Sequence, residues 1–429
     1  MSNIDVFSLN LAVVFIIGLL TYLFSEKTNI SSISILVILG MIVGPFLGIV
    51  DRSIAQKLFD YVRVFGLVII LFAEGHNLKW EILRKRLGVI GILDTVGLFI
   101  TAIIAGMFFS IFFHAPFLIG FLFGAIISAT DPATLIPLFR QNKVDEEMRT
   151  IIVTESIFND PLGIVLTAVA VALVVPQAPT AKFVEGIARY TTLYPAAVIF
   201  FFYEVGVSIA IGLALGIIGY WLMRKLKLQS YAELFSIMMA FGGFAIGEWA
   251  QASGFLVATV MGIVFGNHEI FFKRLNEKVS NVVRSELHFN EILSDFATIF
   301  IFTLLGASLS MSALNNMTWV VFSIIIAGLI IFIARPIAGL TILPSKDISW
   351  REYLFISFEG PRGVVPSALA GLPLSLGMTY HNSQLIHWGE IILTATVMTV
   401  LVTVIVETLW VRKMNKALLL KGRKLESSK

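Results

Sequence analysis

The stretch SATDPATLIP, Ser128–Pro137, lies inside a long apolar run, yet it contains a carboxylate followed at once by a proline. Proline has no backbone N–H to donate, and it disfavours the helical conformation of the residue before it. A helix that reaches Asp131 and Pro132 is therefore predicted to break there. Backbone groups freed in hydrocarbon must find partners, so such a break is tolerated only inside protein or beside a watery cavity.

Composition places this break in a membrane. The 429 residues are 57% hydrophobic and 14% charged, with a mean hydropathy of +0.90, whereas soluble proteins carry about 25% charged residues. Apolar runs of about 20 residues, long enough to cross a bilayer, recur along the chain. We therefore predict an all-α polytopic membrane protein surrounded by membrane lipid.

Other compositional features narrow the class of protein. The first apolar run is long enough to be a span, and no basic segment precedes it, so no signal peptide is expected. The chain contains no cysteine, which excludes disulfides, thiol chemistry and cysteine-based metal sites. Its positive charge lies in loops between apolar runs, so no nucleic-acid partner is predicted.

The apolar runs predict about thirteen transmembrane helices. Connections between them are short, so residues 1–413 are expected to form a single transmembrane domain, followed by a short basic cytoplasmic tail, 414–429. The expected helices lie near residues 5–24, 31–50, 58–75, 87–113, 117–139, 146–175, 195–223, 231–248, 253–266, 288–309, 317–343, 351–375 and 385–411.

Lysine and arginine are distributed unevenly between the two sets of loops. With the N-terminus outside, 24 of the 31 Lys and Arg residues fall in the inner loops and tail, four in the outer loops and three within spans. Positive residues are enriched on the cytoplasmic side of membrane proteins. The pattern predicts a multi-pass protein of the cell membrane, with its N-terminus outside, its C-terminus cytoplasmic and an odd number of spans.

A second stretch, FEGPRGVVP at Phe358–Pro366, repeats the combination of charge and helix-breaking residues. It falls seven expected helices after the first break, and this odd offset gives the two broken helices opposite orientations. We therefore predict inverted six-helix repeats, near 5–175 and 231–411, joined by a connector near 195–223, with two crossed discontinuous helices. Such helices surround a midplane substrate site in secondary transporters. Two proline-kinked packing helices are the alternative interpretation.

The stretch TESIFNDPLGIVL, Thr154–Leu166, places two carboxylates in the sixth expected helix. A charge at mid-bilayer costs at least ~2.5–3.5 kcal/mol, so each one indicates a function. Residues four apart share a helix face. Glu155 is therefore expected to stack with Asn159, and Ser156 with Asp160.

The second of these faces suits a cation. Ser156 and Asp160 offer a hydroxyl and a carboxylate, to which Thr130, Asp131 and Glu74 can add oxygen atoms. Hard cations prefer such ligands, so we predict a site for a monovalent cation at Asp160, Ser156, Thr130 and Glu74, with Asp131 beside it. Burial favours the protonated form of a carboxyl group. Asp160 can then bind either the cation or a proton, and this competition couples two opposing fluxes.

The remaining buried charges are assigned supporting roles. Glu155 is predicted to pair with Arg335, because a guanidinium matches a carboxylate in shape and charge; Asn159 supports this face. Glu359 and Arg362 are expected either to pair locally or to neutralise helix ends at the second break. Acidic residues nearer to helix ends are expected to be structural or interfacial: Glu204, Glu248, Asp295, Glu390 and Glu407.

The motifs ATDPATLIP, ESIFNDPLGIV, the ARP at Ala334–Pro336 and FEGPRGVVPSALA resemble those of the monovalent cation:proton antiporters, specifically the NhaP-type sodium/proton antiporters. The resemblance covers nearly the whole chain. It implies a homodimer of thirteen-span subunits, in which a six-helix bundle moves against a dimerisation domain. Asn159, where some members have a second aspartate, implies electroneutral exchange. The implied ion site is Asp160, Ser156, Thr130, Asp131 and Glu74, and the implied ion bridge is Glu155 with Arg335.

The expected activity is secondary antiport of Na⁺, or Li⁺ as a second candidate, against H⁺ by alternating access. No cofactor and no enzymatic reaction are expected. A K⁺/H⁺ antiporter and a sodium-coupled solute symporter are alternatives, and a cation channel is a remote one. An intramembrane aspartyl protease is disfavoured, because Asp131 and Asp160 lack a Tyr-Asp or Gly-x-Gly-Asp context and the six histidines form no HExxH motif.

Overall fold

The described residues form helices joined by turns and short connections, without strands. In this computed structural model they are residues 3–28, 30–271, 277–344 and 348–420. They divide into two units, of which the first comprises residues up to Arg63, Gly88–Asn159 and residues from Ile299 onward, and the second comprises Val64–Leu87 and Asp160–Thr298. Four helices contribute to both units: α3 (Arg52–Asn77), α4 (Trp80–Ile92), α8 (Glu146–Val174) and α14 (Glu277–Ala307).

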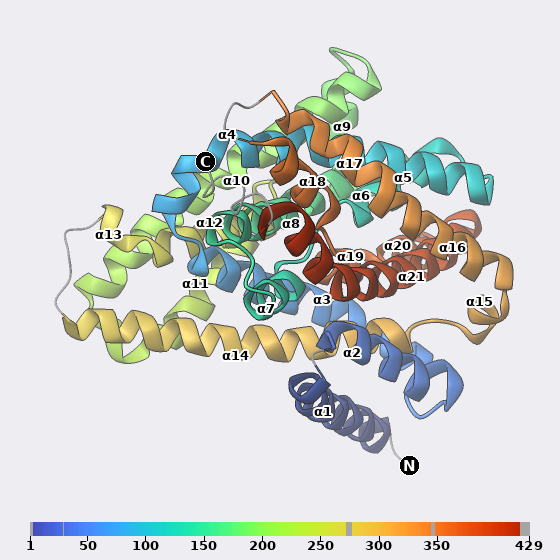
Figure 1. The fold of residues 1–429 in the computed structure, drawn as a ribbon, viewed down its shortest axis with the longest axis horizontal. Helices are drawn as coiled ribbons and strands as arrows, with labels where there is room; N and C mark the ends of the chain where they lie inside the picture. Colours follow the sequence, from blue (N-terminus) through green and yellow to red (C-terminus); the bar gives the residue numbers. More distant parts are fainter. Residues whose placement is uncertain (1–2, 29, 272–276, 345–347, 421–429) are drawn as a thin grey trace. The chain divides into compact units, whose positions relative to one another are not determined.

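The first unit contains both predicted breaks. Within it, α16 and α20 lie along the 32-residue helix α21 (Figure 1). Its further elements are α1 (Asn3–Thr28), α2 (Ser32–Met41), η1 (Ile42–Phe46), η2 (Leu93–Gly97), α5 (Leu98–Phe113), α6 (Phe117–Ile127), α7 (Pro132–Gln141), α15 (Met311–Asn315), α16 (Met317–Leu329), η4 (Ile330–Ala334), α17 (Arg335–Gly339), η5 (Leu340–Ile342), α18 (Trp350–Phe358), α19 (Val364–Leu369), α20 (Leu372–Thr379), α21 (Ser383–Met414) and η6 (Asn415–Leu420).

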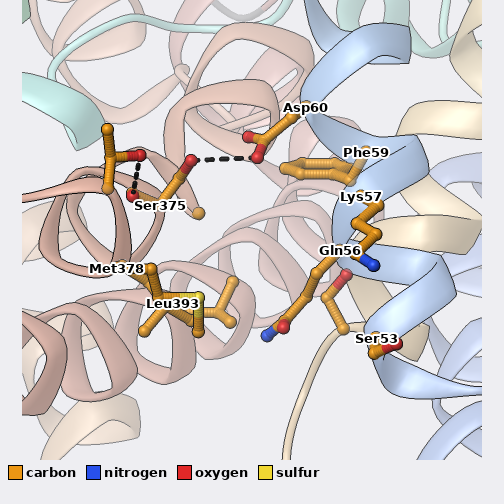
Figure 2. Close-up of a pocket in the computed structure, with 12 residues that line it drawn as sticks. Ser53, Gln56, Lys57, Phe59, Asp60, Ser375, Met378 and Leu393 are labelled. Atoms are coloured by element: carbon orange, nitrogen blue, oxygen red, sulfur yellow. Dashed lines mark hydrogen bonds between the residues drawn. The ribbon is translucent and has the colours of Figure 1, made fainter. Parts of the chain in front are cut away.

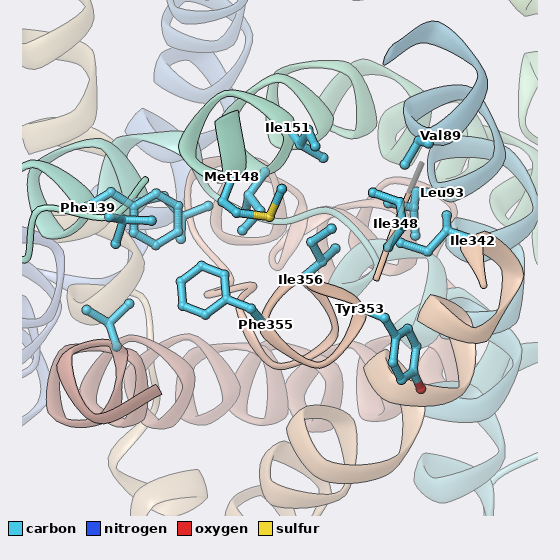
Figure 3. Packing of buried hydrophobic residues seen from close by; sticks show 14 residues of the cluster. Val89, Leu93, Phe139, Met148, Ile151, Ile342, Ile348, Tyr353, Phe355 and Ile356 are labelled. Carbon is cyan, nitrogen blue, oxygen red and sulfur yellow. The ribbon is translucent and has the colours of Figure 1, made fainter. Parts of the chain in front are cut away.

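A buried apolar cluster holds the half-helices of the first unit (Figure 3). Phe139 of α7 and Met148 of α8 contribute to it together with Phe355 of α18. The rings of Phe139 and Phe355 lie with their centroids 6.1 Å apart. Because α7 follows one break and α18 precedes the other, this cluster fixes the two discontinuous helices relative to each other.

Helices α5 and α6 approach very closely. A Cβ added at Gly106 would lie 2.7 Å from the backbone oxygen of Gly120, and one added at Gly124 would collide with the backbone of Ala102. Small residues allow such close backbone contact between membrane helices. The contact anchors α6, the half-helix that leads into the first break.

The second unit has its own aromatic and aliphatic core. Phe72 of α3 packs edge-on against Phe265 of α12, with ring centroids 5.8 Å apart, and Tyr220 and Met261 are buried in the same cluster. The unit contains parts of α3, α8 and α14 and most of α4 (Trp80–Ile92). Its complete elements are α9 (Pro179–Ala188), α10 (Leu193–Lys225), η3 (Leu228–Tyr231), α11 (Ala232–Trp249), α12 (Gly254–Gly266) and α13 (His268–Phe271).

Every helical segment expected from the sequence contains helix in the structure. Seven described helices are long and apolar enough to cross a membrane, and the bent pair α6 and α7 makes an eighth. Three shorter apolar segments also occur: Ser32–Phe46, Gly254–Gly266 and Val364–Thr379. The all-helical membrane architecture is confirmed, while the count of thirteen spans and the inverted repeat stay predictions.

Candidate functional site

The first break lies where Asp131 and Pro132 predict it. Helix α6 ends at Ile127, α7 begins at Pro132, and the two are bent by 45°. Asp131 has an extended backbone, with φ −118° and ψ 109°, as expected before proline. Its carboxylate accepts a hydrogen bond of 2.7 Å from the Thr134 backbone N–H, so it caps α7.

The second break meets the first one directly. Asp131 donates its backbone N–H to the Pro361 carbonyl at 2.9 Å, and its carboxylate accepts the N–H of Val364, the first residue of α19, at 3.3 Å. A Cβ at Gly363 would collide with the Asp131 carboxylate, so this position needs glycine. One carboxylate therefore serves the N-terminal ends of two half-helices, where the helix dipole favours negative charge.

Two arginines lie at the C-terminal ends of α6 and α18, the half-helices that precede the breaks, and donate to backbone carbonyls there. Arg362 donates from Nη1 to the carbonyls of Ser128 and Ala129, at 2.5 and 3.0 Å, where α6 ends. Arg335 donates from Nη2 to the Glu359 carbonyl at 3.5 Å, where α18 ends. Cations are favoured at helix C-termini. Arg362 thus contacts the carbonyl end of α6, and its expected roles, local pairing with Glu359 or neutralisation of a helix end, stay predictions.

Glu155 and Arg335 form a buried bidentate ion pair. The Nη1 and Nη2 atoms of Arg335 donate to Oε1 and Oε2 of Glu155 at 2.7 and 2.8 Å. The two residues are 1% and 6% exposed. Parallel N–H···O bonds of this kind are both stronger and more directional than single ones. The pair joins α8 to α17 within the first unit.

Asn159 links this ion pair to the first break. Its Nδ2 donates to Glu155 at 3.0 Å and to the Thr130 hydroxyl at 2.7 Å, while its Oδ1 accepts the Thr130 N–H at 2.9 Å. These partners fix the orientation of the amide, because a carboxylate can only accept and an N–H can only donate. The Thr130 and Ser156 hydroxyls lie 2.6 Å apart.

The structure thus brings Thr130, Ser156, Asn159 and Glu155 together with Arg335 in the first unit. Every member of this network is buried. Its two hydroxyls provide oxygen atoms that suit a hard cation.

The two remaining predicted ligands belong to the second unit. Asp160 follows Asn159 directly in α8, one helical turn after Ser156, and is 1% exposed. Glu74 lies near the C-terminal end of α3 and is half-buried.

Two further buried acidic residues of the first unit interact with charged residues at the breaks. Glu407, expected to be structural or interfacial, is 3% exposed in α21 and interacts with Glu359. Asp94, to which the sequence assigns no partner, is 2% exposed in the π-helical turn η2 and acts electrostatically on Glu155 and Arg335. The run VIVETLW already signals Glu407, since a lone charge among apolar residues needs a buried partner.

A separate cavity of about 400 Å³ lies within the first unit, between the N-terminal half of α3 and residues of α20 and α21 (Figure 2). It shares no lining residue with the Thr130 network. The Ser375 hydroxyl donates to Asp60 at 2.9 Å across it. At the start of α3, Arg52 binds Glu390 at 2.5 Å, so Glu390 ties α3 to α21.

Two broken helices that touch at their breaks, with compensated ends and buried hydroxyls beside them, are typical of secondary ion transporters. The comparisons identify which kind. The chain matches the family "Sodium/hydrogen exchanger, transmembrane" over residues 11–417, and it belongs to this family. It is therefore a monovalent cation/proton antiporter with a multi-pass membrane architecture, and a transporter rather than an enzyme.

Known relatives match over most of their length. A probable Na⁺/H⁺ antiporter 2 of Methanocaldococcus jannaschii is 34% identical, covering 97% of this chain and 98% of the relative. Na⁺/H⁺ antiporter 1 of the same organism is 31% identical over 93% of both chains. A K⁺/H⁺ antiporter NhaP of Alkalimonas amylolytica is 28% identical and covers 88% of this chain and 62% of its own.

A solved structure supports the same fold. The sodium proton antiporter MjNhaP1 from Methanocaldococcus jannaschii at pH 8 has a TM-score of 0.84 at 29% identity. The match covers 98% of this chain and 100% of that one.

Proposed function

We propose that the protein exchanges Na⁺ for H⁺ in an electroneutral, one-for-one cycle of alternating access, with both ions competing for Asp160. One observation carries the proposal. Glu155 is neutralised by Arg335, and Asn159 is a neutral amide fixed by Glu155 and Thr130. The exchange of charge on this part of α8 is therefore assigned to a single carboxylate, Asp160.

The proposed Na⁺ ligands are Asp160, Ser156, Thr130 and Glu74. Asp131 supports them from the break, where its carboxylate accepts hydrogen bonds from the backbone of α7 and α19 and from the Thr134 hydroxyl. Hydroxyl and carboxylate oxygens suit Na⁺ and Li⁺. The relatives named as Na⁺/H⁺ antiporters favour Na⁺ over the K⁺ alternative.

Proteoliposomes test the exchange directly. An imposed Na⁺ gradient should change the internal pH while the voltage is clamped with K⁺ and valinomycin. The rate should be the same at different clamped voltages, because one charge crosses in each direction. Cation flux without proton counterflow would establish a channel, and a rate that follows voltage would exclude one-for-one exchange. A larger change of internal pH with an imposed K⁺ gradient than with an equal Na⁺ gradient, both measured without valinomycin, would move the chain to the K⁺/H⁺ class.

Variants of the hydroxyls test the ligand set. Ser156→Ala and Thr130→Ala should raise the Na⁺ concentration needed for half-maximal exchange more than they shift its pH dependence, because neither hydroxyl titrates in this range. Equal effects on Na⁺ affinity and on proton dependence would contradict their role as cation ligands.

The remaining parts of the proposal concern topology and assembly. We propose a homodimer in the cell membrane. We also propose that its N-terminus lies outside and its C-terminus in the cytoplasm, because the Lys and Arg residues are concentrated in one set of loops. The cysteine-free chain permits a clean test. A single cysteine at Arg189 should react with an impermeant thiol reagent from outside intact cells, and one at Lys227 should not; the reverse result would invert the topology.

A further inference from the structure

Two carboxylates meet at the second break of the first unit. Glu359 is the C-terminal cap of α18, and Glu407 lies in the C-terminal third of α21. They are 0% and 3% exposed. Their carboxyl groups lie within hydrogen-bonding range of each other. The proposed exchange cycle uses neither of them.

The hydrogen bonds of this pair are incomplete if both groups are ionised. Glu407 accepts the backbone N–H of Gly360, inside the break. Among the described residues, no donor reaches the remaining oxygen of Glu407, Oε1, or either oxygen of Glu359. An ionised carboxylate can only accept. Two such groups in contact need a proton between them to form a hydrogen bond at all.

The nearby charges belong to other contacts. Arg335 of α17 is held by Glu155 of α8, and Asp94 of η2 acts on both. Arg362, in the break itself, gives Nη1 to carbonyls at the end of α6 but faces the pair electrostatically. Two adjacent buried carboxylates cannot both ionise without strong repulsion. One proton leaves the pair with a single negative charge, which the Arg362 guanidinium balances.

We propose that Glu359 and Glu407 hold one proton between them, forming a proton-binding site at the second break that is distinct from Asp160. The proton makes one carboxyl the donor and the other the acceptor. Because Glu407 also accepts from Gly360, the bound proton ties α21 to the non-helical segment between α18 and α19. The site stays occupied in the folded protein whichever cation is exchanged.

Infrared difference spectroscopy tests this site. The spectrum of purified wild-type protein minus that of Glu407→Gln should contain the carbonyl stretch of a protonated carboxyl group at neutral pH, and the band should shift in D₂O. It should persist when Na⁺ is added. A difference spectrum with carboxylate bands alone would overturn the proposal. So would loss of the band on adding Na⁺, because the pair would then bind a cation instead.

Thermal stability gives a second, independent reading. In Glu407→Gln, the amide can donate to Glu359 and its carbonyl can accept from Gly360, so both contacts survive without a proton. A proton that the folded state binds more tightly than the unfolded chain stabilises the fold only while it is bound. The melting temperature of the wild type should therefore fall at alkaline pH more than that of Glu407→Gln.

Matched variants complete the test. Glu146→Gln, at an exposed acid of α8, should keep the wild-type dependence of melting on pH. If Glu407→Gln fails to fold, Glu359→Gln is the reciprocal variant, since its amide can donate to Glu407. Parallel alkaline loss of melting temperature in the wild type and in whichever glutamine variant folds would overturn the proposal.

Discussion

The two helix breaks of the first unit meet, yet they satisfy their polar groups differently. At the first break, Asp131 and Thr130 have hydrogen-bond partners throughout. At the second break, both oxygens of Glu359 and two nitrogens of Arg362 have none among the described residues. The comparison teaches that the first break is a fixed frame that presents hydroxyls. The second has spare hydrogen-bonding capacity, which a proton can use.

Both breaks depend on the ion pair between them, and its loss should have the largest effect. Arg335→Ala leaves Glu155 buried without its counter-charge, which costs ~3–5 kcal/mol in comparable pairs. We expect a large drop of the melting temperature in detergent. The double variant Glu155→Gln/Arg335→Met, which removes both charges, should lose clearly less. Wild-type melting of Arg335→Ala would show that the breaks do not depend on this pair.

The contact between the breaks can be disturbed at Gly363. In Gly363→Ala the new methyl group collides with the Asp131 carboxylate, so we expect a loss of roughly 1–3 kcal/mol, as for other overpacked sites. The control is Gly328→Ala in α16, where an added Cβ meets nothing within 4 Å. Equal melting temperatures for the two variants would mean that the breaks do not meet as closely as described.

Thr130 tests the hydroxyls of the first break by themselves. Thr130→Val keeps the side-chain volume but removes the partner of Ser156 and Asn159, and a buried hydrogen bond contributes about 1 kcal/mol. We expect a small loss of stability together with weaker Na⁺ affinity in exchange assays. Thr130→Ser should retain both properties. A valine variant with wild-type Na⁺ affinity would remove Thr130 from the ligand set.

Asp51 provides an exposed counterpart to the buried cap Asp131. It accepts the N–H groups of Ser53 and Ile54 at the start of α3, at 2.9 and 3.1 Å, and the Ile54 backbone N–H is the main cause that lowers the pKa of Asp51. Asp51→Ala should cost roughly 0.5–1 kcal/mol, the smallest effect of the series.

The pH dependence of this cap has a definite sign. Because its folded-state pKa is lowered, the stabilisation by Asp51 is complete above the ordinary pKa of about 4 and is lost as the pH falls through the folded value. The melting difference between wild type and Asp51→Ala should shrink in that acidic range. Asp51→Asn, which caps without titrating, should show no such change; a constant difference for the alanine variant would contradict the assignment.

How far the sequence carries this account depends on the kind of feature. Asp131 with Pro132 was enough to locate the first break, because proline restricts the backbone locally. The spacing of Glu155 and Asn159 likewise predicts their contact, since a helix fixes which residues are neighbours. The contacts of Arg362 with Ser128 and of Glu407 with Glu359 join residues far apart in the chain. Only the packing of helices decides such partners. The sequence therefore left two roles open for Arg362 and placed Glu407 among the structural or interfacial residues.

The central claim is that Asp160 alone exchanges Na⁺ for H⁺. The most direct test compares wild type and Asp160→Asn in proteoliposomes with an imposed Na⁺ gradient and clamped voltage. The two proteins are reconstituted in equal amounts, and their melting temperatures are compared first to check that the variant is folded. The account predicts that the asparagine variant folds but produces no Na⁺-dependent change of internal pH. Na⁺/H⁺ exchange by folded Asp160→Asn at a rate near that of the wild type would contradict it.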